Sequence, residues 1–100
     1  MKCVYSVKKD NIISSVVIKK DRVYFIENDE RQSLDVDFKL CFNTLISLYS
    51  LKENWRKTNC IDPLYIINFD DEEYCFDLNN LPDNFFMFVG YIDKLVGKLI

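Results

Sequence analysis

Residues 3–27 have the sequence CVYSVKKDNIISSVVIKKDRVYFIE, in which three segments rich in β-branched and aromatic residues are separated by two polar turns. The turns, at 9–11 and 20–21, are too short for a crossover connection, so we expect the three strands to be antiparallel neighbours. A third turn at 28–30 leads into residues 32–36, which can form a short fourth strand. The first third of the chain is therefore predicted to be an antiparallel meander.

A helix is predicted to follow the meander, with Asp35 or Asp37 as its capping residue and its end near Glu53. Apolar side chains recur there at spacings of three and four, which is typical of a helix packed on a sheet. Trp55 is expected to close the core at the end of this helix. The residues of the predicted inward stripe are Phe38, Cys41, Phe42, Leu45, Leu48 and Tyr49.

Residues 65–78 are predicted to form a β-hairpin around an acidic run at 70–73. The run contains no glycine, so we expect a four-residue loop built on a type I turn rather than a type I′ turn. This loop, or a tip at 71–72, would pair Phe69 with Tyr74. The side chains predicted to share one face are Tyr65, Ile67, Phe69, Tyr74, Phe76 and Leu78.

A second helix is predicted to start in the segment 79–83, with Asn80 or Leu81 as the cap and Pro82 in the first turn. The order β-β-β-(β)-α-β-β-α over a single domain, residues 1–100, predicts the α+β class. We expect one antiparallel sheet, made of the N-terminal meander plus the C-terminal hairpin, with both helices packed on one face. The apolar face predicted for the second helix consists of Phe85, Phe88, Val89, Ile92, Leu95, Val96 and Leu99.

The composition restricts the classes of function. Asp and Glu number 16 against 13 Lys and Arg, and this net charge of −3 makes nucleic acid a poor candidate partner. Histidine is missing from the sequence, and with it the commonest general base and the commonest nitrogen ligand of zinc. Neither a glycine-rich phosphate loop nor a nucleophile elbow occurs. We therefore expect no catalytic residue, no cofactor and no metal.

The cysteines and the lack of targeting signals predict a cytoplasmic protein. Cys3, Cys41, Cys60 and Cys75 are widely spaced and form no C-x-x-C pair, so reduced thiols are expected rather than a zinc site or disulfides. No segment resembles a signal peptide or is long and apolar enough for a bilayer, so no membrane partner is expected. Alanine is absent and residues with A/T-rich codons are abundant, as in many mobile elements.

A basic cluster is also predicted near the first two turns. It has two interpretations: lysines that discourage sheet aggregation, which we prefer, or a patch for single-stranded nucleic acid. Together with the acidic run it would make the domain basic at one end of the meander and acidic at the hairpin. The residues of this cluster are Lys8, Lys9, Lys19, Lys20 and Arg22.

The sharpest functional feature is the acidic run with its two flanking rings. We predict that it binds a basic protein partner, with the carboxylates entering a basic groove and a ring as an anchor. The alternative is a polar turn that keeps a hydrophobic hairpin soluble. The residues of this predicted partner-binding site are Phe69, Asp70, Asp71, Glu72, Glu73 and Tyr74.

The leading hypothesis is a non-catalytic inhibitor, an immunity protein that neutralises a toxin or nuclease by occluding its active or nucleic-acid-binding surface. Three alternatives stay open. The first is a phage or virus protein that binds a host defence factor. The second is a homodimeric module joined through the sheet face that carries Val4, Leu64 and Ile66. The third is a small enzyme that uses carboxylates or a cysteine.

Overall fold

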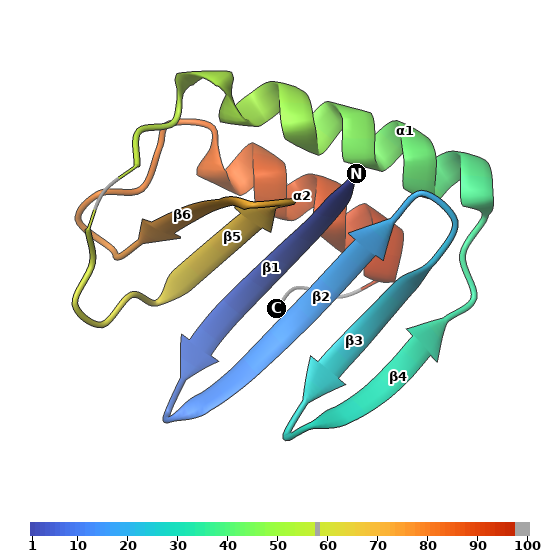
Figure 1. Cartoon of the computed structure of the whole chain (residues 1–100), viewed down its shortest axis with the longest axis horizontal. Coiled ribbons are helices and arrows are strands. Elements are labelled where there is room, and N and C mark those ends of the chain that lie inside the picture. The colour runs from blue at the N-terminus through green and yellow to red at the C-terminus, as the bar shows by residue number, and fades with distance from the viewer. Residues whose placement is uncertain (58, 98–100) are drawn as a thin grey trace.

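A computed structural model describes residues 1–57 and 59–97. Six antiparallel strands form one sheet in the order β4-β3-β2-β1-β5-β6, as Figure 1 shows. The N-terminal meander supplies four neighbouring strands, and the later hairpin adds to the free edge of β1. The strands are β1 (Lys2–Lys9), β2 (Ile12–Lys19), β3 (Val23–Glu27), β4 (Glu30–Leu34), β5 (Tyr65–Phe69) and β6 (Glu72–Phe76).

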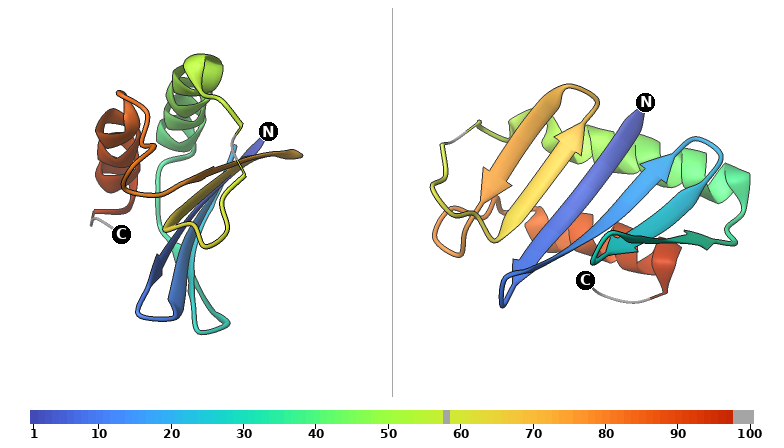
Figure 2. Two further views of the ribbon diagram at one scale, coloured as in Figure 1. Left: turned by 90° about the vertical axis from the view of Figure 1, so that its left-hand side faces the viewer. Right: turned by 60° about the horizontal axis from the view of Figure 1, so that its bottom comes forward.

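Both helices cover the same face of the sheet and leave the other face uncovered (Figure 2). They are α1 (Phe38–Leu51), which a short 3₁₀ turn η1 (Lys52–Asn54) extends, and α2 (Phe85–Val96). The predicted α+β class and the predicted order of elements are confirmed. None of the helices among the described residues is long and apolar enough to cross a membrane.

The meander has tight turns because Asp and Asn tolerate left-handed backbone conformations. Both residues of Asp10-Asn11 have positive φ, 52° and 66°, and both residues of Asn28-Asp29 do as well, 53° and 63°. Positive φ at both central residues is the type I′ turn, which matches the twist of paired strands. The second of these turns is shorter than expected, so β4 begins at Glu30 rather than at Gln32.

The β5–β6 hairpin has a register that differs by two residues from the predicted one. Phe69 pairs with Glu72, and Ile67 pairs with Tyr74. Because Asp70 adopts a φ of 52°, two residues close the turn without glycine, and the predicted four-residue loop is wrong. A shift of two preserves which side chains share a face. Leu78 lies beyond β6 and is 69% exposed, so its predicted place on that face is wrong.

The start of α1 is confirmed, whereas the predicted start of α2 is wrong. The Asp37 carboxylate accepts hydrogen bonds from the N–H groups of Lys39 and Leu40, at 2.7 and 3.4 Å. α2 begins at Phe85, after Asn84, because the preceding segment is bound into turns by its own side chains. The side chain of Asn80, for example, accepts a hydrogen bond from the N–H of Asp77 at 2.6 Å. Leu99 lies outside the described residues.

Aromatic rings fill the core between the sheet and the helices. Trp55 is 8% exposed, and its ring centre lies 5.3 to 5.5 Å from those of Tyr74, Phe76 and Phe88. Such edge-on contacts each add to the free energy of burial. The indole N–H donates to the Asn84 side chain at 2.7 Å, so burial leaves no unpaired donor there. The expectation that Trp55 closes the core is confirmed.

Candidate protein-binding surface

The acidic run begins with a residue that is fixed to the sheet. Asp70 and Asp71 form the turn between β5 and β6. The Asp70 carboxylate accepts a hydrogen bond from the N–H of Lys2 at 3.0 Å, and the Asp70 N–H donates to the Lys2 carbonyl, also at 3.0 Å. The carboxylate of Asp70 therefore holds the turn against the start of β1.

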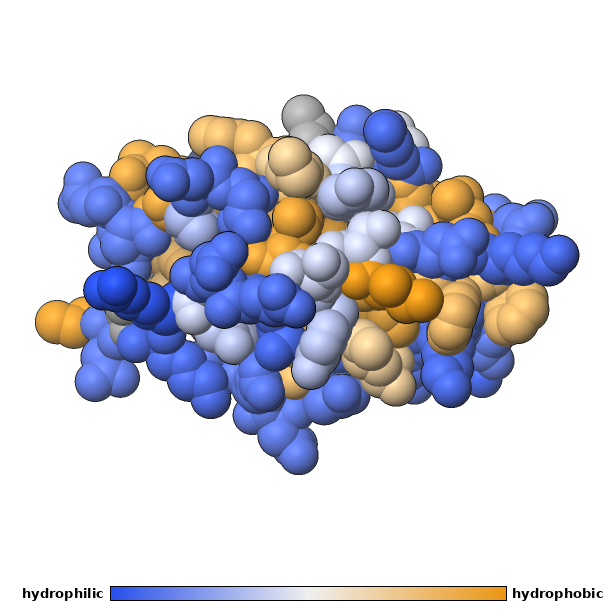
Figure 3. Space-filling model, turned by 90° about the horizontal axis from the view of Figure 1, so that it is seen from above, coloured by the Kyte–Doolittle hydropathy of each residue, from blue (hydrophilic) through white to orange (hydrophobic). Residues whose placement is uncertain are grey.

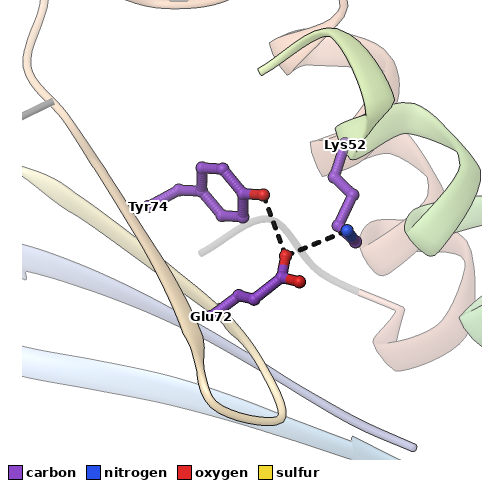
Figure 4. A network of polar contacts seen from close by, with 3 residues as sticks. All are labelled: Lys52, Glu72 and Tyr74. Carbon is purple, nitrogen blue, oxygen red and sulfur yellow. Dashed lines mark hydrogen bonds and ion pairs between the residues drawn. The ribbon is translucent and has the colours of Figure 1, made fainter. Parts of the chain in front are cut away.

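Glu72 connects the hairpin to the end of the first helix. Its Oε2 atom accepts hydrogen bonds from the Lys52 ammonium at 2.9 Å and from the Tyr74 hydroxyl at 3.0 Å (Figure 4). The hydrogen bond between Lys52 and Glu72 holds the pKa of Glu72 below its ordinary value and raises the pKa of Lys52 above its ordinary value. Burial, and then the bond to Glu72, raises the pKa of Tyr74. Glu72 thus ties the hairpin to the end of α1, and its negative charge is paired with the positive charge of Lys52.

The other two carboxylates of the run point into solvent. Asp71 and Glu73 are both exposed. Neither forms an ion pair with any other residue that the structure describes. The four acids of the run therefore divide into two that hold the hairpin in place and two whose exposed carboxylates form no ion pair among the described residues.

The two rings of the predicted site lie in the core. Phe69 is 1% exposed and Tyr74 is 6% exposed. Phe69 contacts the rings of Tyr49 and Trp55, whose centres lie 5.8 and 6.3 Å away. Neither Phe69 nor Tyr74 can insert its ring into a partner, so their contribution is to fix the backbone from which Asp71 and Glu73 project.

The predicted basic cluster is divided between the two ends of the sheet. Antiparallel pairing places Lys8 and Lys9 at one end and Lys19 at the other, opposite Lys2. The acidic turn lies beside Lys2, at the same end as Lys19. The expected separation into a basic and an acidic end is therefore wrong, because each turn reverses the chain and sends successive lysine pairs to opposite ends.

An exposed apolar stripe on α1, which was not predicted from the sequence, lies next to the acidic hairpin. We define the α1 stripe as Phe38, Phe42, Ile46 and Tyr49, which are 57%, 41%, 49% and 40% exposed. Spacings of four, four and three place these residues along one side of the helix. Figure 3, which looks onto the α1 side of the molecule, shows hydrophobic side chains reaching the surface between hydrophilic ones.

Phe38, Phe42 and Tyr49 were predicted to face the sheet and be buried. This prediction is wrong, because all three side chains are exposed. The side of α1 that packs on the sheet carries Cys41 and Leu45, each at most 1% exposed. The sheet therefore meets only one part of the apolar arc that was predicted to face inward.

The α1 stripe approaches the acidic hairpin through Tyr49 and Lys52. The Tyr49 ring meets the Phe69 ring edge-on at 5.8 Å, at the strand end that leads into the acidic turn. The Lys52 ammonium lies 4.3 Å from the centre of the Tyr49 ring and also pairs with Glu72. An apolar area bordered by charged groups has the composition of a protein-binding surface.

Several small hollows lie on the surface of the described residues. Two of about 400 and 280 Å³ lie beside Trp55 and share Asn54 and Pro82 in their walls. A third, of about 170 Å³, lies on the uncovered sheet face beside the ion pair of Lys8 and Asp62. Within residues 1–57 and 59–97, no group of three or more Cys, Asp or Glu side chains could hold a metal ion.

Two of the four thiols are inaccessible. Cys3 and Cys41 are fully buried, and burial raises the pKa of each thiol above its ordinary value. A thiol whose pKa is raised in this way is a poor nucleophile, because the reactive species is the thiolate. Cys60 lies closer to the surface and donates a hydrogen bond to the carbonyl of Cys75 at 3.2 Å.

Comparison with known proteins gives no match: no protein-family model, curated protein or solved structure is detectably similar to this chain.

Proposed function

We propose that this chain is a non-catalytic inhibitor of the immunity-protein type, which binds a basic toxin or nuclease and occludes its active or nucleic-acid-binding surface. The observation that carries the proposal is that the acidic run contains both residues that hold the turn in place and residues that are exposed. Asp70 and Glu72 fix the turn through Lys2 and Lys52, while Asp71 extends into solvent.

Rigidity is what makes this turn suitable for binding. A partner that meets a preformed acidic turn does not have to order a flexible loop, so less conformational entropy is lost on association. The carboxylates of Asp71 and Glu73 can meet lysine or arginine side chains that otherwise contact phosphate groups. Such charge complementarity accelerates association and excludes partners of the wrong charge.

The test is affinity capture with the tagged protein from a lysate of the cells that carry the gene, followed by mass spectrometry. The hairpin variant Asp71→Asn/Glu73→Gln removes two exposed charges from the surface. The matched control Asp29→Asn/Glu30→Gln removes two exposed charges at the turn between β3 and β4, at the opposite end of the sheet.

We expect the wild type and the control to retain the same basic protein in stoichiometric amount, and the hairpin variant to lose it. Equal retention of that protein by all three would contradict the proposal. A phage or virus protein that disarms a host factor would use the same surface, and the identity of the retained protein separates these two functions.

A further inference from the structure

We propose that the α1 stripe is the apolar half of the partner-binding surface, and that an amphipathic helix of the partner occupies it. The apolar face of that helix packs on the stripe, and its Lys or Arg residues lie at the end that meets the acidic hairpin. This inference rests on the proposed function and specifies the chemistry of the partner.

The exposure of the stripe is the first argument. Phe42 and Ile46, in the middle of α1, are 41% and 49% exposed. Large apolar side chains gathered along one side of a helix indicate an interaction site when they adjoin polar groups. The charged groups here are those of Lys52 and Glu72 at one end and Lys39 at the other.

The shape of the stripe favours a helix as the occupant. α1 spans 14 residues, which corresponds to a length of about 21 Å. Side chains at spacings of three and four form ridges that interdigitate with the ridges of a second helix. A partner helix of three to four turns would therefore match the stripe from Phe38 to Tyr49.

Charge complementarity determines which residues the occupant carries. Tyr49, at the end of the stripe, contacts Phe69, and Phe69 immediately precedes the acidic turn. The exposed carboxylate of Asp71 lies in this turn. Glu73 alternates along β6 with the buried Tyr74, so its side chain lies on the uncovered face of the sheet. At the other end, the Asp37 carboxylate is engaged by the first N–H groups of α1, and Lys39 is exposed. A partner helix with its basic residues at the hairpin end would place them near the exposed acidic turn and away from Lys39.

The probe is a synthetic amphipathic peptide with leucines at spacings of three and four and lysines in its last two turns. Its affinity is measured by fluorescence anisotropy at low and at physiological salt. One control peptide has the same composition in scrambled order, and the other carries glutamate in place of lysine. We expect only the amphipathic lysine peptide to bind, and more tightly at low salt.

The matched protein variants are Phe42→Ser/Ile46→Ser in the stripe and Phe86→Ser in α2, where Phe86 is 75% exposed. Circular dichroism and a thermal melt establish that each variant is folded, and Ile46→Lys provides a second, single substitution. We expect the two stripe variants to bind the peptide at least about tenfold more weakly. Phe86→Ser should bind it like the wild type.

Each other outcome is decisive. Absence of binding by the wild type, or unchanged binding by both stripe variants, would overturn the inference. If Asp71→Asn/Glu73→Gln weakens peptide binding while the stripe variants do not, the stripe is excluded and the acidic hairpin retains its role. If the stripe variants weaken binding and the hairpin variant does not, the proposed role of the hairpin fails instead. A wild-type dimer that Ile46→Lys converts to a monomer would assign the stripe to a second copy of the chain and also overturn the inference.

Discussion

The ammonium group of Lys52 lies 2.9 Å from Glu72 Oε2 and 4.3 Å from the centre of the Tyr49 ring. One side chain thereby joins the end of α1, the acidic hairpin and the exposed apolar stripe. The Lys52 side chain is only 11% exposed, although its partner Glu72 is 45% exposed. The geometry of the candidate surface therefore depends on this contact.

Replacement of Lys52 by Met should loosen the hairpin and lower the stability of the fold. The substitution keeps most of the buried stem and leaves Glu72 without its cation. We expect a lower urea midpoint for Lys52→Met and for Glu72→Gln. The double variant should lose less than the sum of the two, because both remove the same interaction. Lys39→Met, at an exposed lysine in the first turn of α1, is the control, and an equal loss there would argue against a specific contribution of the Lys52–Glu72 pair.

The stability should also fall at acidic pH, in part through Glu72. The folded pKa of Glu72 is lower than its ordinary value of 4.5, so its contribution is present above that value and is lost as the pH falls through the folded pKa. Glu72→Gln should therefore show a smaller loss of stability than the wild type when the pH is lowered from 6 to about 3. Urea unfolding across this range is the measurement, and parallel curves for the two proteins would contradict the assignment.

The side chain of Asn84 should contribute to the stability of the fold, because it forms hydrogen bonds with two groups from elsewhere in the chain. Its amide donates to the Leu51 carbonyl at 2.8 Å and accepts from the Trp55 indole at 2.7 Å. Asn84→Ala leaves both groups without this partner, which should cost about 1–3 kcal/mol for each group that water cannot reach. The free energy of unfolding is measured in urea by the fluorescence of the single tryptophan. Asn43→Ala, at an exposed position of α1, should change it by less than about 0.5 kcal/mol.

The thiols should differ in their rate of alkylation. Cys3 and Cys41 are buried, and their pKa values are raised, whereas Cys60 and Cys75 are partly exposed. Mass spectrometry after brief treatment with iodoacetamide should find label on Cys60 and Cys75 first. All four should react once urea unfolds the chain. Early labelling of Cys3 would show that the first strand is not packed as described.

The elements were predictable because their residues carry strong local patterns. β-branched and aromatic residues alternate along the meander, and Asp37 caps α1. The hairpin register was not predictable, since it depends on whether Asp70 accepts a positive φ, and that is a property of the turn in its surroundings. The prediction of which hairpin side chains share a face did not depend on the exact register, because a shift of two residues leaves each side chain on the same face.

The acidic residues of the candidate surface could be predicted from the sequence, whereas their contacts with other elements could not. The exposure of Asp71 and Glu73 follows from their position in and beside a turn. The engagement of Glu72 by Lys52 joins residues 20 positions apart and depends on how α1 crosses the hairpin. The exposure of Phe42 and Ile46 depends on which arc of α1 meets the sheet, and spacing alone does not specify that arc.

The central claim, that the exposed acids of the hairpin bind a basic protein, is tested most directly by the affinity of the purified, captured partner for three forms of the chain. These are the wild type, Asp71→Asn/Glu73→Gln and the charge-matched control Asp29→Asn/Glu30→Gln. We predict that the hairpin variant binds at least about tenfold more weakly, with a weaker dependence on salt, and that the control matches the wild type. Equal affinities for the hairpin variant and the control would contradict the claim.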